Sequence, residues 1–426
     1  MRYRHRVLTL LFFLSIITYL DRVCISVAGP RMQEDLNLSP QQWGWVVGLF
    51  TLSYALFEIP SGAMADRIGS RKVLTRIVAW WSVFTTMTGV VSNYYALLFV
   101  RFAFGAGEAG AYPSSSSTIS RWFPVRERGK AHGIVWMASR LGGAISPLLV
   151  IPIQIAYGWR MSFYIFGVVG LVWCVIWWIF FRDHPEEKAG VTQEEIEEIG
   201  GGARVAHIKL PWGQALKSKN LWMIMLMYHT YCWGSYFYLS WLHTYLQKGR
   251  GFTESEMKIY SMLPFLAGAV GNIFGGSLSD ALVGRLGLKR GRVLVGATGL
   301  FVSALCLFGT AVTANRYWAV AFLTFGYFSM DCMLPVSWSI CLDVGKRYAG
   351  TVTGAMNMAG QAGSFISSVS FGYMVAYFGS YDQPLLIFSA MLAISAFIYT
   401  RIDPTEELVP ERLTAPDPVP VGVGHS

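Results

Sequence analysis

The chain has 426 residues, of which 54% are hydrophobic and 14% are charged, and its mean hydropathy is +0.43. A soluble domain carries about 25% charged residues, so most of this surface must face something other than water. The net charge of +9 does not indicate nucleic acid binding, because the basic residues gather in short loops that follow alternate apolar segments.

Apolar segments of about 20 residues, the length that crosses a ~30 Å hydrocarbon core, recur along the chain. They span residues 7–28, 43–65, 73–91, 95–117, 133–156, 163–181, 221–246, 257–279, 293–312, 317–342, 350–377 and 384–402. The first is long enough to span and contains Asp21 and Arg22, so we expect it to remain as a helix rather than to be removed as a leader. The pattern predicts an all-α membrane protein with twelve transmembrane helices.

A charged stretch between residues 183 and 219 separates the first six segments from the last six. It contains TQEEIEEI, which has little apolar periodicity, so we expect it to lie exposed in the cytoplasm. GAMADRIGSRK after the second segment and GGSLSDALVGRLGLKRGR after the eighth indicate two related halves. We therefore predict six-helix bundles at 1–182 and 220–403, a cytoplasmic linker at 183–219 and a disordered, proline-rich cytoplasmic tail at 404–426.

The short loops differ in charge on the two sides of the membrane. MRYRHR, DRIGSRK, RWFPVRERGK, GRLGLKRGR and GKRY are rich in Lys and Arg, and the loops between them are poorer. The positive-inside rule places both termini in the cytoplasm. An even number of spans requires the same arrangement, so we predict a multi-pass protein of the inner cell membrane.

The loop after the second segment carries GAMADRIGSRK, which matches the GxxxDRxGxRK signature of the major facilitator superfamily. The resemblance implies a conformational latch. Glycine lets helices approach closely, an acid is favourable near a helix N-terminus, and the basic residues hold the loop at the cytoplasmic face. The predicted latch residues are Gly62, Asp66, Arg67, Gly69, Arg71 and Lys72. The alternative is a plain positively charged loop.

A narrower resemblance rests on five stretches: YLDRVCIS, SYALFEIPSG, RFAFGAGEAGAYPS, YGWR followed by SFYIFGVVGLVW, and AGTVTGAMNMAG. Together they resemble the anion:cation symporter family. That family includes bacterial proton-coupled importers of sugar acids and animal vesicular glutamate and sialate transporters. The resemblance covers nearly the whole transmembrane chain, and it is more specific for the family than for a substrate.

Four charges lie within the first and fourth segments. A charge at bilayer depth is costly, so each is a candidate for function. Arg101 and Glu108 are two helical turns apart, on one stripe and about 10 Å from each other. Asp21 and Arg22 diverge by about 100°, so we expect Arg22 to face the cavity and Asp21 to meet a partner on the fourth helix, such as Arg101.

The family resemblance implies roles for these four residues. Asp21 and Glu108 match its protonation sites, and Arg22 and Arg101 match the arginines that help to hold the anion. The alternative is a structural salt-bridge network that joins helices 1 and 4. Buried pairs are weak stabilisers, and packing of small residues would join the helices without buried charge.

Two tyrosines and a third arginine extend this predicted site. Tyr19 and Tyr54 match positions that line the family's cavity, where a phenol can donate to a carboxylate or a hydroxyl; the alternative is simple packing between helices. Arg140 departs from the family pattern, which has a neutral polar residue there. Arg140 either binds a second anionic group of the substrate or offsets Glu58, and both interpretations stay open.

Polar groups embedded in the second half are mostly uncharged: Tyr228, His229, Tyr231, Tyr236, Trp338, Asn357 and Gln361. Asn357 and Gln361 stand four apart on one helical face, spaced to meet one ligand. Asn357 also matches a family position that contacts substrate hydroxyls. We therefore predict that Asn357, Gln361 and Trp338 bind substrate.

Other titratable residues are weaker candidates. Asp331 is a possible third titrating site, and Asp343 lies near the cytoplasmic end, where a gate or cap is expected. His229 and His243 could carry protons, since imidazole titrates near neutrality, but lone histidines in helices are more often packed.

No catalytic, metal or cofactor motif is present in the sequence. It lacks HExxH, GxSxG, a Walker loop and a dinucleotide fingerprint, and its six cysteines show no CxxC spacing. We predict that the protein is not an enzyme and uses no metal or other cofactor.

The sequence thus predicts a secondary active transporter, acting as a monomer, that imports an organic anion by proton symport and alternating access. Neutral groups in the second half favour a sugar acid, either a hexuronate or an aldonate; a dicarboxylate or an aromatic acid stays open. One alternative is a facilitator or exchanger that uses the same arginines without proton coupling. Another is a membrane sensor that signals through the EEIEEI stretch.

Overall fold

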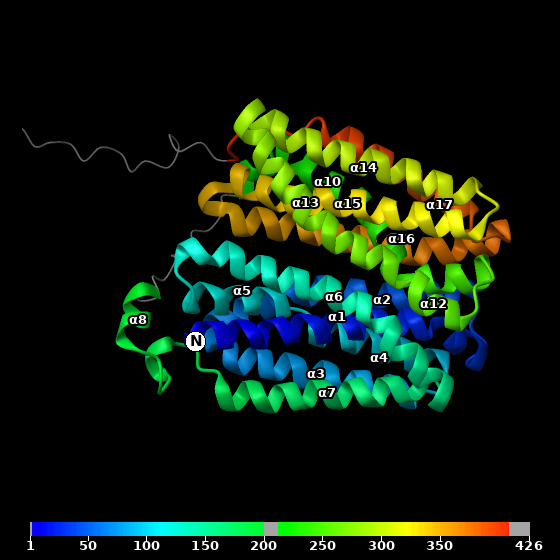
Figure 1. Ribbon diagram of the computed structural model, residues 1–426, viewed down its shortest axis with the longest axis horizontal. Helices are drawn as coiled ribbons and strands as arrows, with labels where there is room; N and C mark the ends of the chain where they lie inside the picture. The colour runs from blue at the N-terminus through cyan, green and yellow to red at the C-terminus, as the bar shows by residue number, and fades with distance from the viewer. Residues whose placement is uncertain (1, 200–211, 409–426) are drawn as a thin grey trace, which may run out of the picture.

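The computed structural model describes residues 2–199 and 212–408. Within these ranges the chain is almost entirely helical and contains no β-strand. Figure 1 shows two bundles that lie side by side, one built from α1 to α7 and the other from α10 to α17. This arrangement confirms the predicted all-α fold with two halves.

The first bundle contains the first half of the chain. Its helices are α1 (Tyr3–Asp35), α2 (Pro40–Ile68), α3 (Ser70–Val90), α4 (Tyr94–Glu108), α5 (Ala111–Trp122), α6 (Val125–Tyr157) and α7 (Trp159–Phe180). The fourth predicted segment is therefore broken between α4 and α5, and the continuous helix predicted over 95–117 is wrong. Gly110 has a φ of +91°, and a Cβ there would overlap Ser61 of α2, so only glycine allows the chain to turn at this point.

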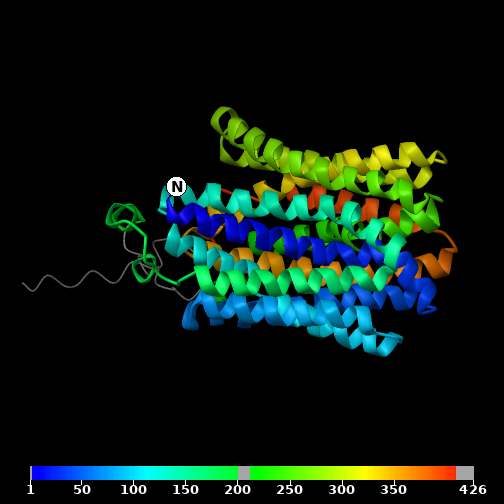
Figure 2. The ribbon, with the colours of Figure 1, turned by 60° about the horizontal axis from the view of Figure 1, so that its bottom comes forward.

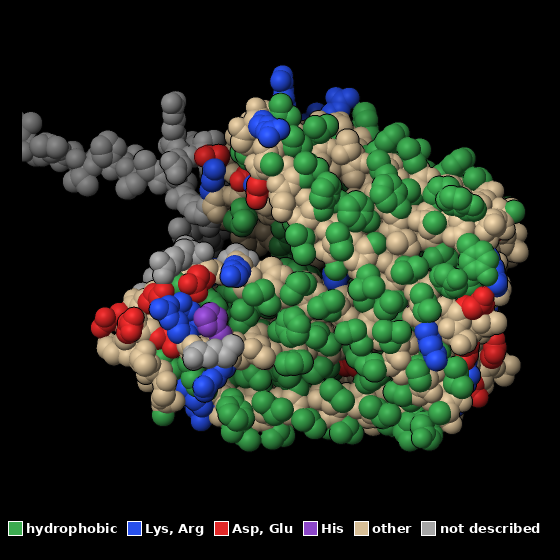
Figure 3. Space-filling view, viewed as in Figure 1, with side chains coloured by type: hydrophobic (Ala, Val, Ile, Leu, Met, Phe, Trp, Pro, Cys, Tyr) green, Lys and Arg blue, Asp and Glu red, His purple; other side chains and the backbone are tan. Residues whose placement is uncertain are grey.

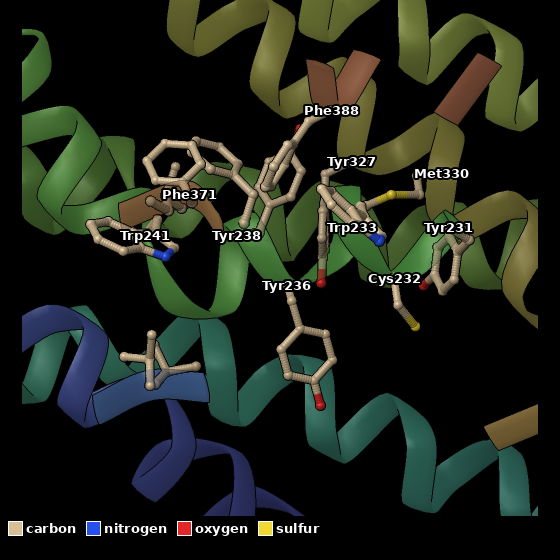
Figure 4. Packing of buried hydrophobic residues seen from close by; sticks show 14 of the residues in the cluster. Tyr231, Cys232, Trp233, Tyr236, Tyr238, Trp241, Tyr327, Met330, Phe371 and Phe388 are labelled. Atoms are coloured by element: carbon tan, nitrogen blue, oxygen red, sulfur yellow. The ribbon is translucent and has the colours of Figure 1, made fainter. Parts of the chain in front are cut away.

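The second bundle contains the second half of the chain. Its helices are α10 (Lys219–Ser240), α11 (Leu242–Thr244), α12 (Glu254–Tyr260), α13 (Met262–Leu286), α14 (Leu288–Val312), α15 (Arg316–Gly345), α16 (Ala349–Phe378) and α17 (Gln383–Tyr399). Aromatic rings fill its interior (Figure 4): the ring of Phe371 lies 4.8 Å from that of Trp241 and 5.4 Å from that of Phe388. This rigid interior supports the inner face of α10, which reaches the site.

The outer surface of the helices suits a bilayer. Within the described residues, six helical segments are long and apolar enough to cross a membrane by length and composition. On the face shown in Figure 3, hydrophobic side chains cover the middle of the molecule, and charged side chains gather mostly toward its two ends. Helix α7, for example, exposes Val168, Val172 and Val175 on one side and buries Trp173 and Trp177 on the other.

Helices within each bundle pack closely through glycine. Helix α13 crosses α15 with Gly271 and Gly275 at the contact, where a Cβ on Gly275 would overlap the backbone of Cys332. A Cβ on the neighbouring Gly276 would find its nearest atom, on Pro335, at 3.8 Å. The two adjacent glycines therefore face very different surroundings.

Gly275→Ala is expected to destabilise the protein by about 1–3 kcal/mol, because the added methyl group must push α13 away from α15. Gly276→Ala is the matched control. It should leave stability unchanged or raise it slightly, since alanine is the better helix former. Thermal unfolding of both variants in detergent measures the difference, and equal melting temperatures would contradict this account of the packing.

The linker contains α8 (Gln193–Ile199), which lies at the same end of the molecule as the N-terminus (Figures 1 and 2). Glu195 is buried, and its carboxylate accepts hydrogen bonds from the backbone N–H groups of Tyr3 and Arg4 at 3.0 and 2.9 Å. The Arg4 guanidinium donates to Glu198 at 2.9 Å. The prediction of a fully exposed linker is thus wrong for α8, because the unpaired N–H groups at the start of α1 need acceptors.

Glu195→Ala is expected to lower the free energy of unfolding by about 0.5–2 kcal/mol, the usual effect of losing a cap at a helix N-terminus. Glu194→Ala, one residue earlier and exposed, is the control and should have little effect. Melting temperatures in detergent test this, and the account of α8 fails if the two variants lose the same stability.

The end of the described chain packs against the second bundle. Lys289 donates to Asp403 at 2.6 Å, and this bond, with those from Thr405, holds the pKa of Asp403 at about 2. The backbone N–H of Leu408 donates to the carbonyl of Val344 at 3.0 Å, and Leu408 is buried. Residues 404–408 therefore do not belong to the predicted disordered tail. The rest of that tail, residues 409–426, lies outside the described residues.

Candidate functional site

A cavity between the two bundles brings together residues from both halves of the sequence. It includes Tyr19 and Arg22, halfway along α1. Of the eight predicted substrate-binding residues, seven line this cavity: Tyr19, Arg22, Tyr54, Arg140, Trp338, Asn357 and Gln361. The eighth, Arg101, lines a smaller cavity that also contains Arg22. Figure 3 shows the molecule hollowed between the bundles on the side of α8.

The Arg22 guanidinium is surrounded by aromatic rings. Its Cζ lies 4.8 Å from the ring centroid of Tyr54, 5.4 Å from those of Tyr19 and Phe50, and 6.0 Å from that of Tyr112. Ring faces attract a cation without neutralising it. The cage therefore fixes the position of Arg22 and leaves its charge available to an anion.

Glu108 supplies the counter-charge to Arg22. Its Oε1 lies 2.5 Å from Arg22 Nε, and the glutamate is fully buried. Its second oxygen, Oε2, has no hydrogen-bond partner among the described residues. Because α4 ends at Glu108, the side chain lies at the break before α5.

Arg101 has no carboxylate in direct contact within the part of the chain that the structure describes. Its Cζ lies 4.9 Å from the ring centroids of Phe50 and Phe104, and its Nε is buried without a hydrogen-bond partner in the described chain. Phe50 thus touches both Arg22 and Arg101. Of these two arginines, only Arg22 has a directly bonded carboxylate among the described residues, so an anion is favoured beside Arg101.

Asp21 is buried, and neither of its carboxylate oxygens has a hydrogen-bond partner in the part of the chain that the structure describes. The predicted contact with Arg101 is therefore wrong as a direct bond, although the two charges interact electrostatically. The pairing that forms is between Arg22 and Glu108, because the break after α4 brings Glu108 to α1. An unpartnered carboxylate in such a place is costly when charged.

Glu58 and Asn357 bridge the bundles on the other side of the cavity. Asn357 Nδ2 lies 2.8 Å from both carboxylate oxygens of Glu58. The proposed pairing of Glu58 with Arg140 does not occur. Arg140 instead lies against Asp331 of the second bundle, with Arg140 Nη2 3.0 Å from Asp331 Oδ1.

The second bundle lines the cavity with aromatic and amide groups. The Tyr236 hydroxyl donates to Gln361 Oε1 at 3.1 Å, and Figure 4 shows Tyr236 projecting from α10 away from the aromatic interior toward the first bundle. Trp338 contacts Trp136 of the first bundle, with ring centroids 5.4 Å apart. Sequence reasoning missed Trp136 and Tyr112, although both are aromatic residues within predicted membrane segments.

The end of the molecule opposite α8 is closed by polar contacts between the bundles. Arg31 of α1 donates to Glu254 of α12 at 2.5 and 2.7 Å. The Ser26 hydroxyl lies 3.0 Å from His243 Nδ1, and Gln33 donates to Thr244 at 3.1 Å. The sequence predicted none of these pairs, because they join helices distant in the chain. His243 thus has a packed, bundle-bridging position, and its role in proton transfer stays a prediction.

Two other weak candidates lie outside the cavity. His229 Nδ1 is 3.1 Å from the carbonyl oxygen of Ala359. Asp343 lies 3.4 Å from Arg292 near the end of α15, so its recorded contact is an ion pair, and its predicted role as a gate or cap stays a prediction. Neither faces the arginines of the first bundle.

The predicted latch is described only in part. The structure describes the backbone of Gly62, Asp66 and Arg67 as part of α2 but not their surroundings, so their predicted roles stay predictions. Gly69 has a φ of +91° just before α3, and a Cβ there would overlap Asp183. The backbone N–H of Arg71 donates to Asp183 Oδ1 at 3.0 Å, just after the end of α7. Lys72 is exposed.

A family model matches most of the chain, in agreement with the observed fold. The chain matches the family model of the Major Facilitator Superfamily over residues 11–368. The protein belongs to the major facilitator superfamily. As a member of this superfamily it is a multi-pass membrane transporter and not an enzyme.

Several known transporters are similar in sequence to this superfamily member over nearly its whole length. It is 38% identical over 408 residues to the "Probable sulfoacetate transporter" of Cupriavidus necator, with 94% of each chain covered. It is 28% identical to the "Hexuronate transporter" of Bacillus subtilis, with 93% of each covered, and 28% identical to a "Probable galactarate/D-glucarate transporter" of Escherichia coli, which covers 93% of this chain and 92% of that one. These relatives confirm the predicted resemblance to the anion transporters of the superfamily.

Solved structures support the same fold. Two crystal structures of a bacterial homologue of the human lysosomal transporter Spinster, both described as inward-facing, superpose with TM-scores of 0.76 and 0.77. They are 21% and 20% identical in sequence, and each match covers 94% of this chain and 97% of the other. At this identity the likeness concerns the fold alone.

Proposed function

We propose that this protein imports an organic anion by proton symport, with a sugar acid or a small dianionic acid as the substrate. The observation that carries the proposal is the buried Arg22–Glu108 ion pair, at 2.5 Å, beside Arg101 and Asp21. Among the described residues, Nε of Arg101 and both carboxylate oxygens of Asp21 lack hydrogen-bond partners. Buried charges need neutralisation. Protons on the two acids and an anion on the two arginines satisfy that need together.

The proposed cycle alternates the partner of Arg22. In the outward-open state, Glu108 takes up a proton and releases Arg22, and Asp21 takes up a proton in its buried position. The anion then binds Arg22 and Arg101. After the bundles rock and the cavity opens toward α8, both acids lose their protons to water. Glu108 then competes for Arg22 again, and the anion leaves.

The closed contacts at the far end fit one state of this cycle. The Arg31–Glu254 and Ser26–His243 contacts hold the bundles together there, while the molecule is hollowed on the α8 side (Figure 3). If α8 is cytoplasmic, as the basic loops favour, this arrangement faces inward. We propose that both termini are cytoplasmic, that the protein lies in the inner membrane and that the monomer is the transporting unit.

The chemistry of the cavity supports the substrate class. Tyr54, Gln361 and Asn357 offer neutral donors and acceptors suited to hydroxyl groups, while the arginines suit carboxylate or sulfonate. The printed names of the relatives cover both kinds of acid: sulfoacetate in one, and hexuronate or galactarate and glucarate in others.

Uptake into proteoliposomes tests the proposal. The purified protein should accumulate radiolabelled hexuronate, galactonate, galactarate or sulfoacetate when the outside is more acidic than the inside. A protonophore should abolish accumulation but leave counterflow exchange. Exchange without accumulation under any pH gradient would favour the exchanger instead, and binding without flux would favour a sensor.

A further inference from the structure

Arg140 and Asp331 form an ion pair that joins the two bundles beside the cavity. Arg140 Nε and Nη2 each lie 3.0 Å from a different carboxylate oxygen of Asp331, and Nη1 donates to the Tyr327 hydroxyl at 3.0 Å. Arg140 belongs to α6 of the first bundle, and the other two residues belong to α15 of the second. A bidentate pair of this kind is strong and directional.

The two partners are placed differently relative to the cavity. Arg140 lines it, whereas Asp331 is fully buried and also accepts a hydrogen bond from Asn272 of α13 at 3.0 Å. An arginine has five N–H donors in a planar fork. Donors that Asp331 and Tyr327 do not use are therefore left on the cavity-lining guanidinium.

Arg140 lines the same cavity as Arg22, the first arginine of the proposed site, and shares an aromatic neighbour with it. The Cζ atoms of Arg22 and Arg140 are 5.4 and 6.0 Å from the centroid of one and the same ring, that of Tyr19. Each arginine has its own carboxylate, Glu108 for Arg22 and Asp331 for Arg140. Because both guanidinium groups line one cavity, a substrate bound in that cavity is placed to contact both.

We propose that Arg140 is a second anion subsite, which Asp331 occupies until a substrate with two anionic groups displaces it. This inference rests on the proposed function. The ligands in question are dianionic acids, such as aldarates and sulfocarboxylates. A monoanion leaves the Arg140–Asp331 pair intact.

Displacement of Asp331 has a consequence for protons. A carboxylate that loses its guanidinium partner while buried is strongly destabilised. Asp331 therefore takes up a proton from the water of the open cavity as the second anionic group binds Arg140. A dianion thus crosses with one more proton than a monoanion, and the net charge moved per cycle is the same for both.

The surroundings of Asp331 favour this exchange. Within the described residues, no lysine, histidine or second carboxylate from α6, α10, α13, α14 or α16 interacts with it. The groups that do face it are Arg140, Asn272, Tyr327, Cys332, Tyr231 and Tyr238. Phenols and thiols are neutral near pH 7, so the guanidinium alone balances the charge of Asp331.

Two matched pairs of ligands test the inference on the purified full-length protein. Galactarate and galactonate share a carbon skeleton and differ in having a carboxylate or a hydroxymethyl group at one end. Sulfoacetate and isethionate differ in the same way. A pH indicator in weak buffer measures the protons that the protein takes up when a ligand binds. Binding of the dianion of each pair should be accompanied by uptake of about one more proton than binding of the monoanion.

Two variants assign this extra proton. Asp331→Asn leaves Arg140 free at all pH values, so the extra proton should disappear while the preference for the dianion remains. Arg140→Gln/Asp331→Asn removes both charges and so avoids an isolated buried charge. It should reduce the ratio of dianion to monoanion affinity by about tenfold or more. Asp343→Asn, on the same helix, is the control and should change neither quantity.

Equal proton uptake for both members of a pair in the unmodified protein would overturn the inference. An unchanged affinity ratio in the double variant would do so as well. If the monoanions bind and are transported but no dianion binds, the second subsite is refuted while the proposed function stands. Failure of all four ligands and of a hexuronate to bind would instead refute the proposed substrate class, and the inference with it.

Discussion

Arg101→Ala is expected to abolish measurable binding of the anion. The guanidinium lies in a dry aromatic contact with Phe50 and Phe104, 4.9 Å from each ring centroid, and has no directly bonded carboxylate. A ligand carboxylate would therefore be its main counter-charge. Loss of such a buried charged contact typically weakens binding by 2–5 kcal/mol, which is about 30-fold or more in Kd.

Binding of radiolabelled substrate to the purified variant measures this effect. Arg316→Ala is the control, since Arg316 is also an arginine in contact with aromatic rings but lies outside the cavity at the start of α15, where it pairs with Glu256. The control should bind within about twofold of the unmodified protein, because the Arg316–Glu256 pair is partly exposed to solvent and remote from the cavity. Normal binding by a folded Arg101→Ala variant would remove Arg101 from the site. Its melting temperature shows whether the variant is folded.

Glu108→Gln is expected to separate binding from proton coupling. Glutamine has nearly the shape of protonated glutamate, so Arg22 loses its ionic partner, the one at 2.5 Å, without a large change in packing. The anion should then bind as well as or better than before, with a weaker dependence on pH, because Asp21 is then the remaining titrating acid of the proposed pair. Counterflow exchange should continue, whereas accumulation driven by an inward proton gradient should be lost.

Parallel assays in one set of proteoliposomes make this test decisive. Counterflow reports binding and rocking, and gradient-driven uptake reports coupling. Glu194→Gln, in the exposed part of α8, serves as the control and should retain both activities. Gradient-driven accumulation by Glu108→Gln would show that Glu108 is structural, as in the alternative of a salt-bridge network between helices 1 and 4.

The helix break at Gly110 shows where sequence patterns stop being informative. Hydropathy located the fourth segment correctly, but it could not reveal that α4 ends at Glu108. That break depends on the left-handed conformation of Gly110 and on Ser61 of α2, which leaves no room for a Cβ. A glycine in a helix has many roles, and only the neighbouring helix distinguishes them.

The sequence also did not determine which carboxylate pairs with which arginine. The sequence placed Arg22, Arg101 and Asp21 within the membrane and left the partner of Arg140 open between the substrate and Glu58. The structure pairs Arg22 with Glu108 and Arg140 with Asp331, at 2.5 and 3.0 Å. Helical periodicity describes one helix at a time, so it does not determine how two helices are rotated toward each other.

The sequence by itself determined the membrane class, the superfamily and the buried positions that carry charge, because hydropathy and short motifs are local properties of the chain. The tertiary structure alone decided which carboxylate neutralises which arginine and that the acid on α8 caps α1. Those contacts join residues far apart in the chain, and they depend on the packing of whole helices rather than on any local pattern.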